Sequence, residues 1–302
     1  MSNTIERIGT GEGLVTRAAI VGGTHGNELT GIHLIRRWQS NPREVARPSF
    51  STELLIGNPK ATSLNRRFVD QDLNRSFGLG SLSDNQSTHY EVARAAQINA
   101  LLGPKGAPHV DFIIDLHTST SNVGAMIIIA IGDVYNRRLA AYLQSRVPGA
   151  RIFCAPPVSS EHELTYLTSI CSRSLAVEVG PIPQGTLDDR LFSLSADLTA
   201  HALDYVHKVN TGDALELPSS IEVFQASGIM HFPMLDGHIN GIIHESLSGR
   251  DYEPLLPKAP IFRTLAGEVI YYEGDEVVYP VFINEAAYYY QGQAMTLTVK
   301  KT

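Results

Sequence analysis

The sequence predicts an α/β fold, a mixed sheet flanked by helices, followed by a smaller β-rich C-terminal domain. Two observations carry this prediction. Short apolar segments alternate with segments of helical spacing over the first two thirds of the chain. After residue 209 only short β-type segments follow, with no evident helix of any length. We therefore expect one domain over residues 1–210 and a second over residues 211–302.

Hydrophobic periodicity defines the elements of the first domain. Short apolar runs are typical of buried strands, and apolar residues three or four positions apart are typical of a helix that buries one face. The expected strands cover residues 18–23, 50–56, 109–116, 126–131 and 175–179. The expected helices start at residue 27 and cover residues 90–102 and 187–207.

The second domain begins after a linker-like stretch that contains Asn210-Thr211-Gly212-Asp213. Its expected strands cover residues 221–224, 238–244, 268–272, 277–283 and 294–299. No internal repeat links the two domains.

Composition excludes several classes of protein. The 302 residues are 43% apolar and carry a net charge of −7, which argues against a dedicated nucleic-acid binder. The longest strongly apolar run, residues 125–131, is far shorter than the roughly 18 residues of a membrane span. Residues 1–15 lack the apolar core of a signal peptide, and two cysteines make no disulfide framework. We expect a cytoplasmic globular protein without membrane or nucleic-acid partners.

Metal-ligating residue types follow two of the expected strands. His25 and Glu28 follow the first strand, and Asp115-Leu116-His117 closes a later one. Two imidazoles and one carboxylate suit a catalytic zinc ion whose fourth position stays open for water. Asp115 shares a strand face with His117 and is placed to orient its ring. Taken alone, each residue has an ordinary interpretation, such as a loop histidine or a glutamate at the start of a helix. Their joint placement at strand ends favours a metal-binding site instead.

Two further features point to chemistry at the same edge. The segment 66–75 contains Arg66, Arg67 and Arg75, and arginine binds carboxylates in a planar, two-pronged geometry. A solvated turn is the alternative for this segment. Glu178 lies among apolar residues in a strand, where a carboxylate is costly unless it is paired or functional. We interpret Glu178 as a general base of raised pKa, the alternative being a solvent-facing strand-end glutamate.

Five ordered blocks carry a resemblance. GGTHGNELTG (22–31), DQDLNRSF (70–77), DLHTSTSNVG (115–124), EVGPIPQG (178–185) and VYPVFINEAAYY (278–289) resemble the aspartoacylase family, a branch of the zinc carboxypeptidase-like hydrolases that includes aspartoacylase and aminoacylase-3. The resemblance implies a zinc-hydrolase domain whose substrate site is capped by the C-terminal domain. It also implies a homo-oligomer, a dimer or larger.

The resemblance assigns roles residue by residue. It implies one Zn²⁺ per chain, bound by His25, Glu28 and His117, with Glu178 as the base. It implies that Arg67 polarises the acyl carbonyl and that Asn74 and Arg75 bind the carboxylate of the amino acid. Tyr166 and Tyr288 are implied as further substrate-binding residues.

The implied activity is zinc-dependent deacylation of small N-acyl-L-amino acids, with N-acetyl-L-aspartate, cleaved to L-aspartate and acetate, as the leading substrate. Two positions depart from the aspartate-specific pattern. Thr118 stands where many members have asparagine, and Arg173 is the only arginine near Tyr166. If Arg173 does not reach the pocket, the alternative is an aminoacylase-3-like deacylase of N-acetyl aromatic amino acids or mercapturates. A non-catalytic protein that binds a metal or a carboxylate is the alternative from a different class.

Overall fold

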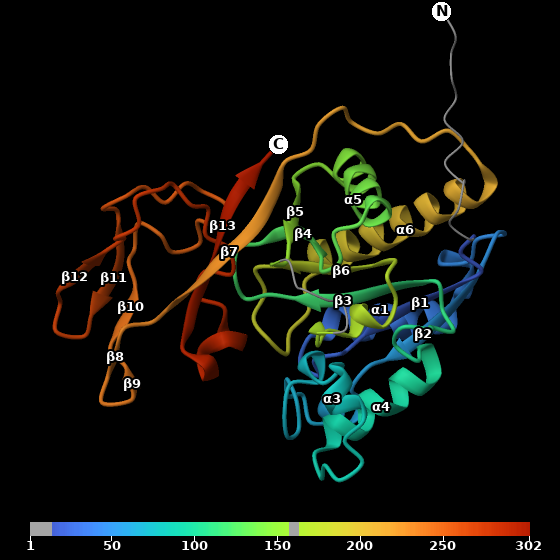
Figure 1. The fold of residues 1–302 in the computed structure, drawn as a ribbon, viewed down its shortest axis with the longest axis horizontal. Coiled ribbons are helices and arrows are strands. Elements are labelled where there is room, and N and C mark those ends of the chain that lie inside the picture. The colour runs from blue at the N-terminus through green and yellow to red at the C-terminus, as the bar shows by residue number, and fades with distance from the viewer. Residues whose placement is uncertain (1–13, 157–162) are drawn as a thin grey trace, which may run out of the picture.

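The computed structural model describes residues 14–156 and 163–302, so most of the segment on which the signal-peptide expectation rests lies outside the described residues. Eight strands form the central sheet (Figure 1) in the order β13-β7-β5-β4-β6-β3-β1-β2. The strands are β1 (Arg17–Gly22), β2 (Ser51–Ile56), β3 (Phe112–Thr118), β4 (Gly124–Ile129), β5 (Ala150–Cys154), β6 (Ser174–Gly180), β7 (Val223–His231) and β13 (Gln293–Lys301). Two pairs, β4–β6 and β7–β13, are antiparallel, and the other five are parallel. The sheet is therefore mixed, as predicted.

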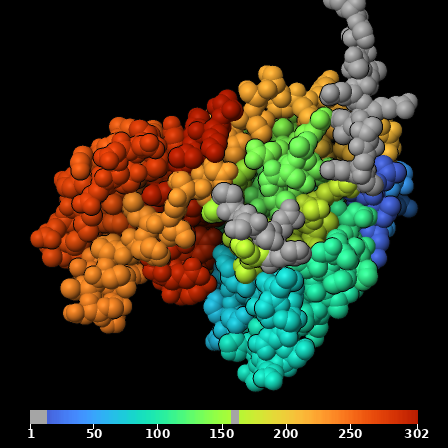
Figure 2. Space-filling model, viewed as in Figure 1, coloured from blue at the N-terminus to red at the C-terminus, as the bar shows by residue number. Residues whose placement is uncertain are grey.

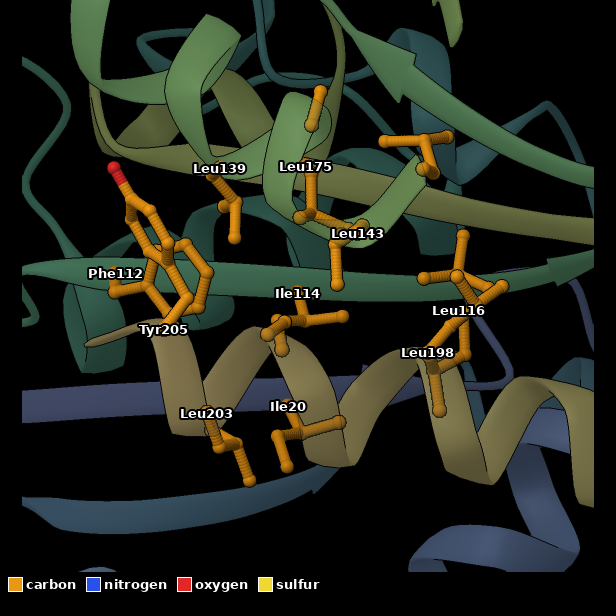
Figure 3. Close-up of a cluster of buried hydrophobic side chains, with 14 of the residues drawn as sticks. Ile20, Phe112, Ile114, Leu116, Leu139, Leu143, Leu175, Leu198, Leu203 and Tyr205 are labelled. Atoms are coloured by element: carbon orange, nitrogen blue, oxygen red, sulfur yellow. The ribbon is translucent and has the colours of Figure 1, made fainter. Parts of the chain in front are cut away.

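Three helices cover one face of the sheet, namely α1 (Leu29–Ser40), α5 (Val134–Arg146) and α6 (Asp189–Thr211). Their apolar stripes pack on alternate residues of the strands, among them Ile20, Ile114 and Leu116 (Figure 3). Because side chains alternate along a strand, the residues between them, including Asp115 and His117, point to the opposite face.

The opposite face is covered in two parts. Over β1 and β3 lie α4 (Tyr90–Leu102) and the short helices η2 (Leu73–Arg75) and η4 (Leu167–Ile170). Over β4, β5 and β7 lie apolar side chains from the C-terminal part of the chain, with Phe282 among them. The remaining short helices of the first part are η1 (Pro42–Glu44), α2 (Pro59–Ser63) and α3 (Leu79–Leu82).

The C-terminal residues also build a lobe with its own apolar core, seen in orange and red in Figure 2. The lobe contains β8 (Met234–Leu235), β9 (His238–Ile239), β10 (Gly241–Ile243), β11 (Pro260–Thr264), β12 (Val269–Tyr271) and the 3₁₀ helix η5 (Ala286–Gln291). The boundary expected near residue 210 falls at the end of α6 and stays a prediction. Strands β7 and β13, which come after it, belong to the eight-stranded sheet.

Several elements differ from the sequence expectation. Helix α5 and strands β5 and β11 were not expected, and η5 is a short helix where none was evident. The strand expected over residues 277–283 does not form, and only isolated bridges at Val278 and Val281 remain. Pro280 removes a backbone donor and Phe282 has a φ of 55°, and either is enough to break a regular ladder.

Candidate active site

One cavity of about 690 Å³ brings the predicted site residues together at the carboxyl ends of β1, β3 and β6. All nine line it: His25, Glu28, Arg67, Asn74, Arg75, His117, Tyr166, Glu178 and Tyr288. They come from segments that are far apart in the sequence, from the loop after β1 to η5. The position agrees with the rule that ligands of α/β sheets collect where strands end.

Tight backbone packing shapes the loop that carries His25 and Glu28. A Cβ atom on Gly26 would lie 2.1 Å from the backbone carbon of Ala61, so only glycine fits there. The N–H group of Gly26 donates to the carbonyl of Arg67, 3.1 Å away. The loop after β1 is thereby held against the segment that carries the arginines.

Three ligand atoms meet in this loop region. Nδ1 of His25 lies 3.2 Å from Nδ1 of His117, and the Glu28 carboxylate oxygens lie 2.7 Å and 3.0 Å from these two nitrogens. All three residues are buried. Tetrahedral zinc with bonds of about 2.1 Å separates its ligands by about 3.4 Å, so a small widening of this cluster would admit the ion.

Carboxylates behind the two histidines fix their orientation. Nε2 of His117 lies 2.8 Å from Oδ2 of Asp115, and Nε2 of His25 lies 3.0 Å from Oδ1 of Asp72. When each Nε2 donates to its carboxylate, each Nδ1 presents a lone pair to the other and to Glu28. A cation satisfies such a group of acceptors, so the donor set fits a metal. Asp115 plays the orienting part expected from the sequence.

The charges around Glu28 keep it ionised. Burial alone would raise its pKa, but attraction to His25 and His117 outweighs burial and lowers the pKa of Glu28 below its usual range. Asp72 behaves in the same way, because burial is outweighed by His25 and Arg67 and its pKa is lowered. Glu28 and Asp72 therefore both bring negative charge to the cluster.

Arg67 connects the metal cluster to the rest of the cavity. Its Nη1 donates to Glu28 over 3.1 Å, and its Nη2 donates to Asp72 over 3.0 Å. Among the residues described, its buried Nε has no hydrogen-bond partner. Each Nη also carries a second N–H besides the one in its ion pair, and Arg67 lines the cavity, so these N–H groups remain to bind a ligand there.

Asn74 and Arg75 lie on η2 beside η4. The Asn74 side-chain oxygen accepts from the N–H of Leu167 over 2.8 Å, which leaves its NH₂ group for the cavity. The Arg75 guanidinium lies 5.0 Å from the centre of the Tyr166 ring, a cation–π distance. Tyr166 therefore holds Arg75 in a fixed plane.

Glu178 lies opposite His117 in the β3–β6 register, so both side chains are on the cavity face. Burial raises the pKa of Glu178 well above its usual range; attraction to His117 opposes this shift, and repulsion from Glu28 adds to it. Burial also raises the pKa of Tyr288 above its usual value, so its hydroxyl stays protonated and can donate. A proton acceptor and a proton donor thus face the same cavity.

Sequence reasoning missed Glu285. Its Oε2 accepts from the hydroxyl of Ser119 and, over 2.9 Å, from the N–H of Thr120, and its Oε1 accepts from Ala287 over 3.0 Å. These bonds tie η5, which carries Tyr288, to the loop that follows His117. The only signal in the sequence was that Glu285 stands three residues before Tyr288.

Arg173 does not line the cavity. Its guanidinium lies 5.0 Å from the centre of the Tyr135 ring, on the side of the sheet where α5 packs. Among the described lining residues, the cationic side chains are Arg67 and Arg75 alone. Thr168, which follows Tyr166 by two positions, does line the cavity. The far wall consists mainly of apolar side chains, which include Ile128, Ala130, Phe153, Ala226, Ile229 and Phe282.

Comparisons with known proteins agree with this geometry. The succinylglutamate desuccinylase/aspartoacylase catalytic domain matches residues 15–206, and the AstE/AspA barrel-sandwich hybrid domain matches residues 219–300. The chain belongs to the succinylglutamate desuccinylase/aspartoacylase family. The family and the α/β fold with a β-rich C-terminal part, both expected from the sequence, are confirmed.

Individual members of the family are similar over nearly the whole chain. A probable aspartoacylase of Trichodesmium erythraeum is 43% identical over 95% of this chain and 98% of its own length. An N-acyl-aromatic-L-amino acid amidohydrolase (carboxylate-forming) of Rattus norvegicus is 44% identical over 90% of this chain and 87% of its own. The crystal structure of murine aminoacylase 3 superposes with a TM-score of 0.90 at 41% identity, covering 96% of this chain and 97% of that one.

Membrane spans were also sought. Within residues 14–156 and 163–302, none of the helices combines the length and the apolar character needed to cross a bilayer.

Proposed function

We propose that this protein is a zinc-dependent amidohydrolase that deacylates N-acyl-L-amino acids, with a preference for neutral and aromatic side chains. The observation that carries the proposal is the cavity itself. It holds the His25, Glu28 and His117 ligand set, the half-buried Glu178 and two arginines within one volume of about 690 Å³. The names of the family members at 43% and 44% identity support the reaction class.

His25, Glu28 and His117 would hold a zinc ion, which when bound would supply Lewis-acid activation of a water molecule and of the acyl carbonyl. Glu178 accepts a proton from the attacking water, because its raised pKa lies nearer the working pH than that of an ordinary glutamate. The same carboxyl then donates this proton to the nitrogen of the leaving amine. The products are a short carboxylic acid and a free amino acid.

The arginines and Tyr288 bind the two ends of the substrate. Arg67 donates to the acyl oxygen and stabilises the negative charge that develops there. Arg75, held by Tyr166, and the NH₂ group of Asn74 bind the α-carboxylate. The protonated hydroxyl of Tyr288 donates a further hydrogen bond from the C-terminal side.

The preference for neutral side chains follows from the far wall. Within the described lining, a second carboxylate, as in N-acetyl-L-aspartate, would find no cation beyond Arg67 and Arg75, because Arg173 packs on Tyr135 instead. A buried carboxylate without a partner is costly. Aromatic side chains would instead contact Ile128, Phe153 and Phe282. Aspartate remains the second candidate, since a probable aspartoacylase is as similar to this chain as the aromatic amidohydrolase is.

A released-amine assay tests the proposal. The zinc-loaded protein is given N-acetyl-L-tyrosine or N-acetyl-L-aspartate, each with and without a chelator. We expect cleavage that the chelator abolishes and that favours tyrosine. Faster cleavage of the aspartate compound would overturn the side-chain preference alone. One bound zinc per chain without turnover of either compound would favour the non-catalytic alternative, a metal- or carboxylate-binding protein.

Zinc as the metal, a homo-oligomeric state and a cytoplasmic location remain proposals that the same preparation can test. Metal analysis of the purified protein identifies the ion. Light scattering gives the mass of the particle in solution, which we expect to be that of a dimer or larger.

A further inference from the structure

The carboxyl group of Glu91, in the first turn of α4, is completely buried and is outside the cavity. Its Oε1 accepts from Nδ2 of Asn58 over 2.9 Å and from the N–H of Val69 over 2.7 Å. Its Oε2 accepts from the N–H groups of Asp70 and Gln71 over 3.0 Å and 3.2 Å. Three consecutive backbone N–H groups are thus gathered on one side chain.

The same contact is reinforced from the opposite direction. Oδ2 of Asp70 accepts from the N–H of Tyr90 over 2.7 Å, at the start of α4. Oε1 of Gln71 lies 2.7 Å from Nδ1 of His89. Residues 69–71 and residues 89–91 are therefore joined by hydrogen bonds that use side chains from both segments.

This contact lies between two parts of the arginine segment that are anchored elsewhere. On one side, the carbonyl of Arg67 accepts from Gly26 in the metal-ligand loop. On the other side, Asn74 accepts from Leu167, and the N–H of Phe77 donates to the carbonyl of Thr165. Residues 69–71 connect these parts, and Glu91 holds the backbone of this connection in place.

We propose that Glu91 is a positioning residue that sets the spacing between the acyl-binding Arg67 and the carboxylate-binding Arg75, and thereby selects α-amino acid amides over β-amino acid amides. This inference rests on the proposed function. In an α-amino acid amide, one carbon separates the amide nitrogen from the carboxylate. A β-amino acid inserts one more carbon, which adds about 1.5 Å. A misplacement of about 1 Å can cost about a hundredfold in rate.

The experiment compares N-acetyl-L-tyrosine with N-acetyl-β-homotyrosine, which has the same side chain and one additional CH₂ before the carboxylate. For the wild-type protein, we expect kcat/KM to be about a hundredfold higher for the α compound. Glu91→Gln places an NH₂ group against backbone N–H donors and loosens residues 69–71. We expect the α/β ratio to fall about tenfold, chiefly through a higher KM for the α compound, with unchanged metal content.

Asp111→Asn is the matched control. Oδ2 of Asp111 also gathers backbone N–H groups, from Thr16 over 2.8 Å and from Arg17 over 3.1 Å, but it lies away from the cavity. We expect this variant to keep the wild-type α/β ratio. A loss of kcat/KM by the same factor on both compounds in Glu91→Gln would overturn the proposal and leave Glu91 a purely structural residue.

Asp70→Ala decides the question if Glu91→Gln does not fold. It removes only the exposed bond to Tyr90, and it should lower the α/β ratio in the same direction by a smaller factor. An unchanged ratio in Asp70→Ala would then overturn the inference, as would a wild-type protein that cleaves both compounds equally. A zinc-loaded wild-type protein that cleaves neither would refute the proposed function itself.

Discussion

The two walls of the cavity differ in how their polar groups are satisfied. On the near wall, the metal-ligand cluster and Arg67 are tied together by ion pairs: His117 contacts Asp115 and Glu28, and Arg67 contacts Glu28 and Asp72. The far wall, from β4, β5, β7 and the C-terminal part, offers mainly apolar or neutral side chains. Under the proposed function, the near wall carries the reaction and the far wall sets side-chain selectivity, so the two can be altered separately.

The largest effect is expected on the near wall. Glu178→Gln removes the proton acceptor and keeps its size, and general-base catalysis contributes about 10²–10⁴-fold. We expect kcat to fall by about that factor while bound zinc stays at one per chain, measured by steady-state kinetics and metal analysis. Full turnover by this variant with zinc bound would exclude Glu178 as the base.

A smaller loss is expected from the carboxylates behind the ligands. Asp115→Asn weakens the hydrogen bond that orients His117 and should lower metal affinity about 10–100-fold. Competition with a coloured chelator measures this affinity. Thr168→Ala, on the cavity but without contact to a ligand histidine, serves as the control and should bind metal as the wild type does.

A change at Thr168, a neutral lining residue on η4, should alter substrate preference without removing the chemistry. Thr168→Arg adds a cation to a lining position that has none, and we expect the ratio of kcat/KM for N-acetyl-L-aspartate over N-acetyl-L-tyrosine to rise about tenfold. Arg173→Ala is the comparison, since Arg173 does not line the cavity. If Arg173→Ala changed this ratio and Thr168→Arg did not, the proposed origin of the side-chain preference would be wrong.

The smallest effect on activity is expected at Asp251, which does not line the cavity and accepts from the N–H of Ile283. Burial raises the pKa of Asp251 to about 6. The folded protein therefore binds this proton more tightly than the unfolded chain, whose aspartates titrate near about 3.9. Stability from this group is complete below about pH 4 and is lost as pH rises through about 6.

The side chain introduced by Asp251→Asn does not titrate. In thermal melts between pH 4 and pH 7, the Tm of the variant relative to the Tm of the wild type should therefore rise with pH. The expected gain is about 4–8 °C, because a pKa difference of about 2 corresponds to about 2 kcal/mol over this pH range and each kcal/mol to about 2–4 °C in Tm. Parallel pH profiles for the two proteins would show that Asp251 has the same pKa in the folded and unfolded chains.

The sequence predicted the strands β1, β2, β3, β4 and β6 because each contains a short apolar run that ends in glycine or in polar residues. It did not predict α5, whose start, Val134-Tyr135-Asn136-Arg137-Arg138, mixes polar residues into the apolar stripe. The sequence also did not predict the order of the strands in the sheet. Nothing local in residues 223–231 or 293–301 shows that these strands extend the first domain's sheet.

The residues of the candidate site also differ in whether the sequence alone could reveal them. Residues with rare chemistry in short motifs, such as His25 and His117, could be found from spacing and from the family resemblance. Glu91 and Glu285 could not, because each acts through backbone N–H groups that approach it only in the folded chain. A glutamate in a helix or before a tyrosine has no sequence signature that separates it from a surface residue.

The continuity of the sheet through β7 and β13 has a consequence for protein engineering. Residues 219–300 match a domain of their own, yet they carry two strands of the eight-stranded sheet and Glu285 and Tyr288 of the cavity. A chimaera that exchanges this block with a relative would replace the sheet edge and part of the pocket together. The block is therefore a poor unit to exchange whole, and a graft of selectivity should replace only its cavity-lining residues, such as Ile229 and Phe282.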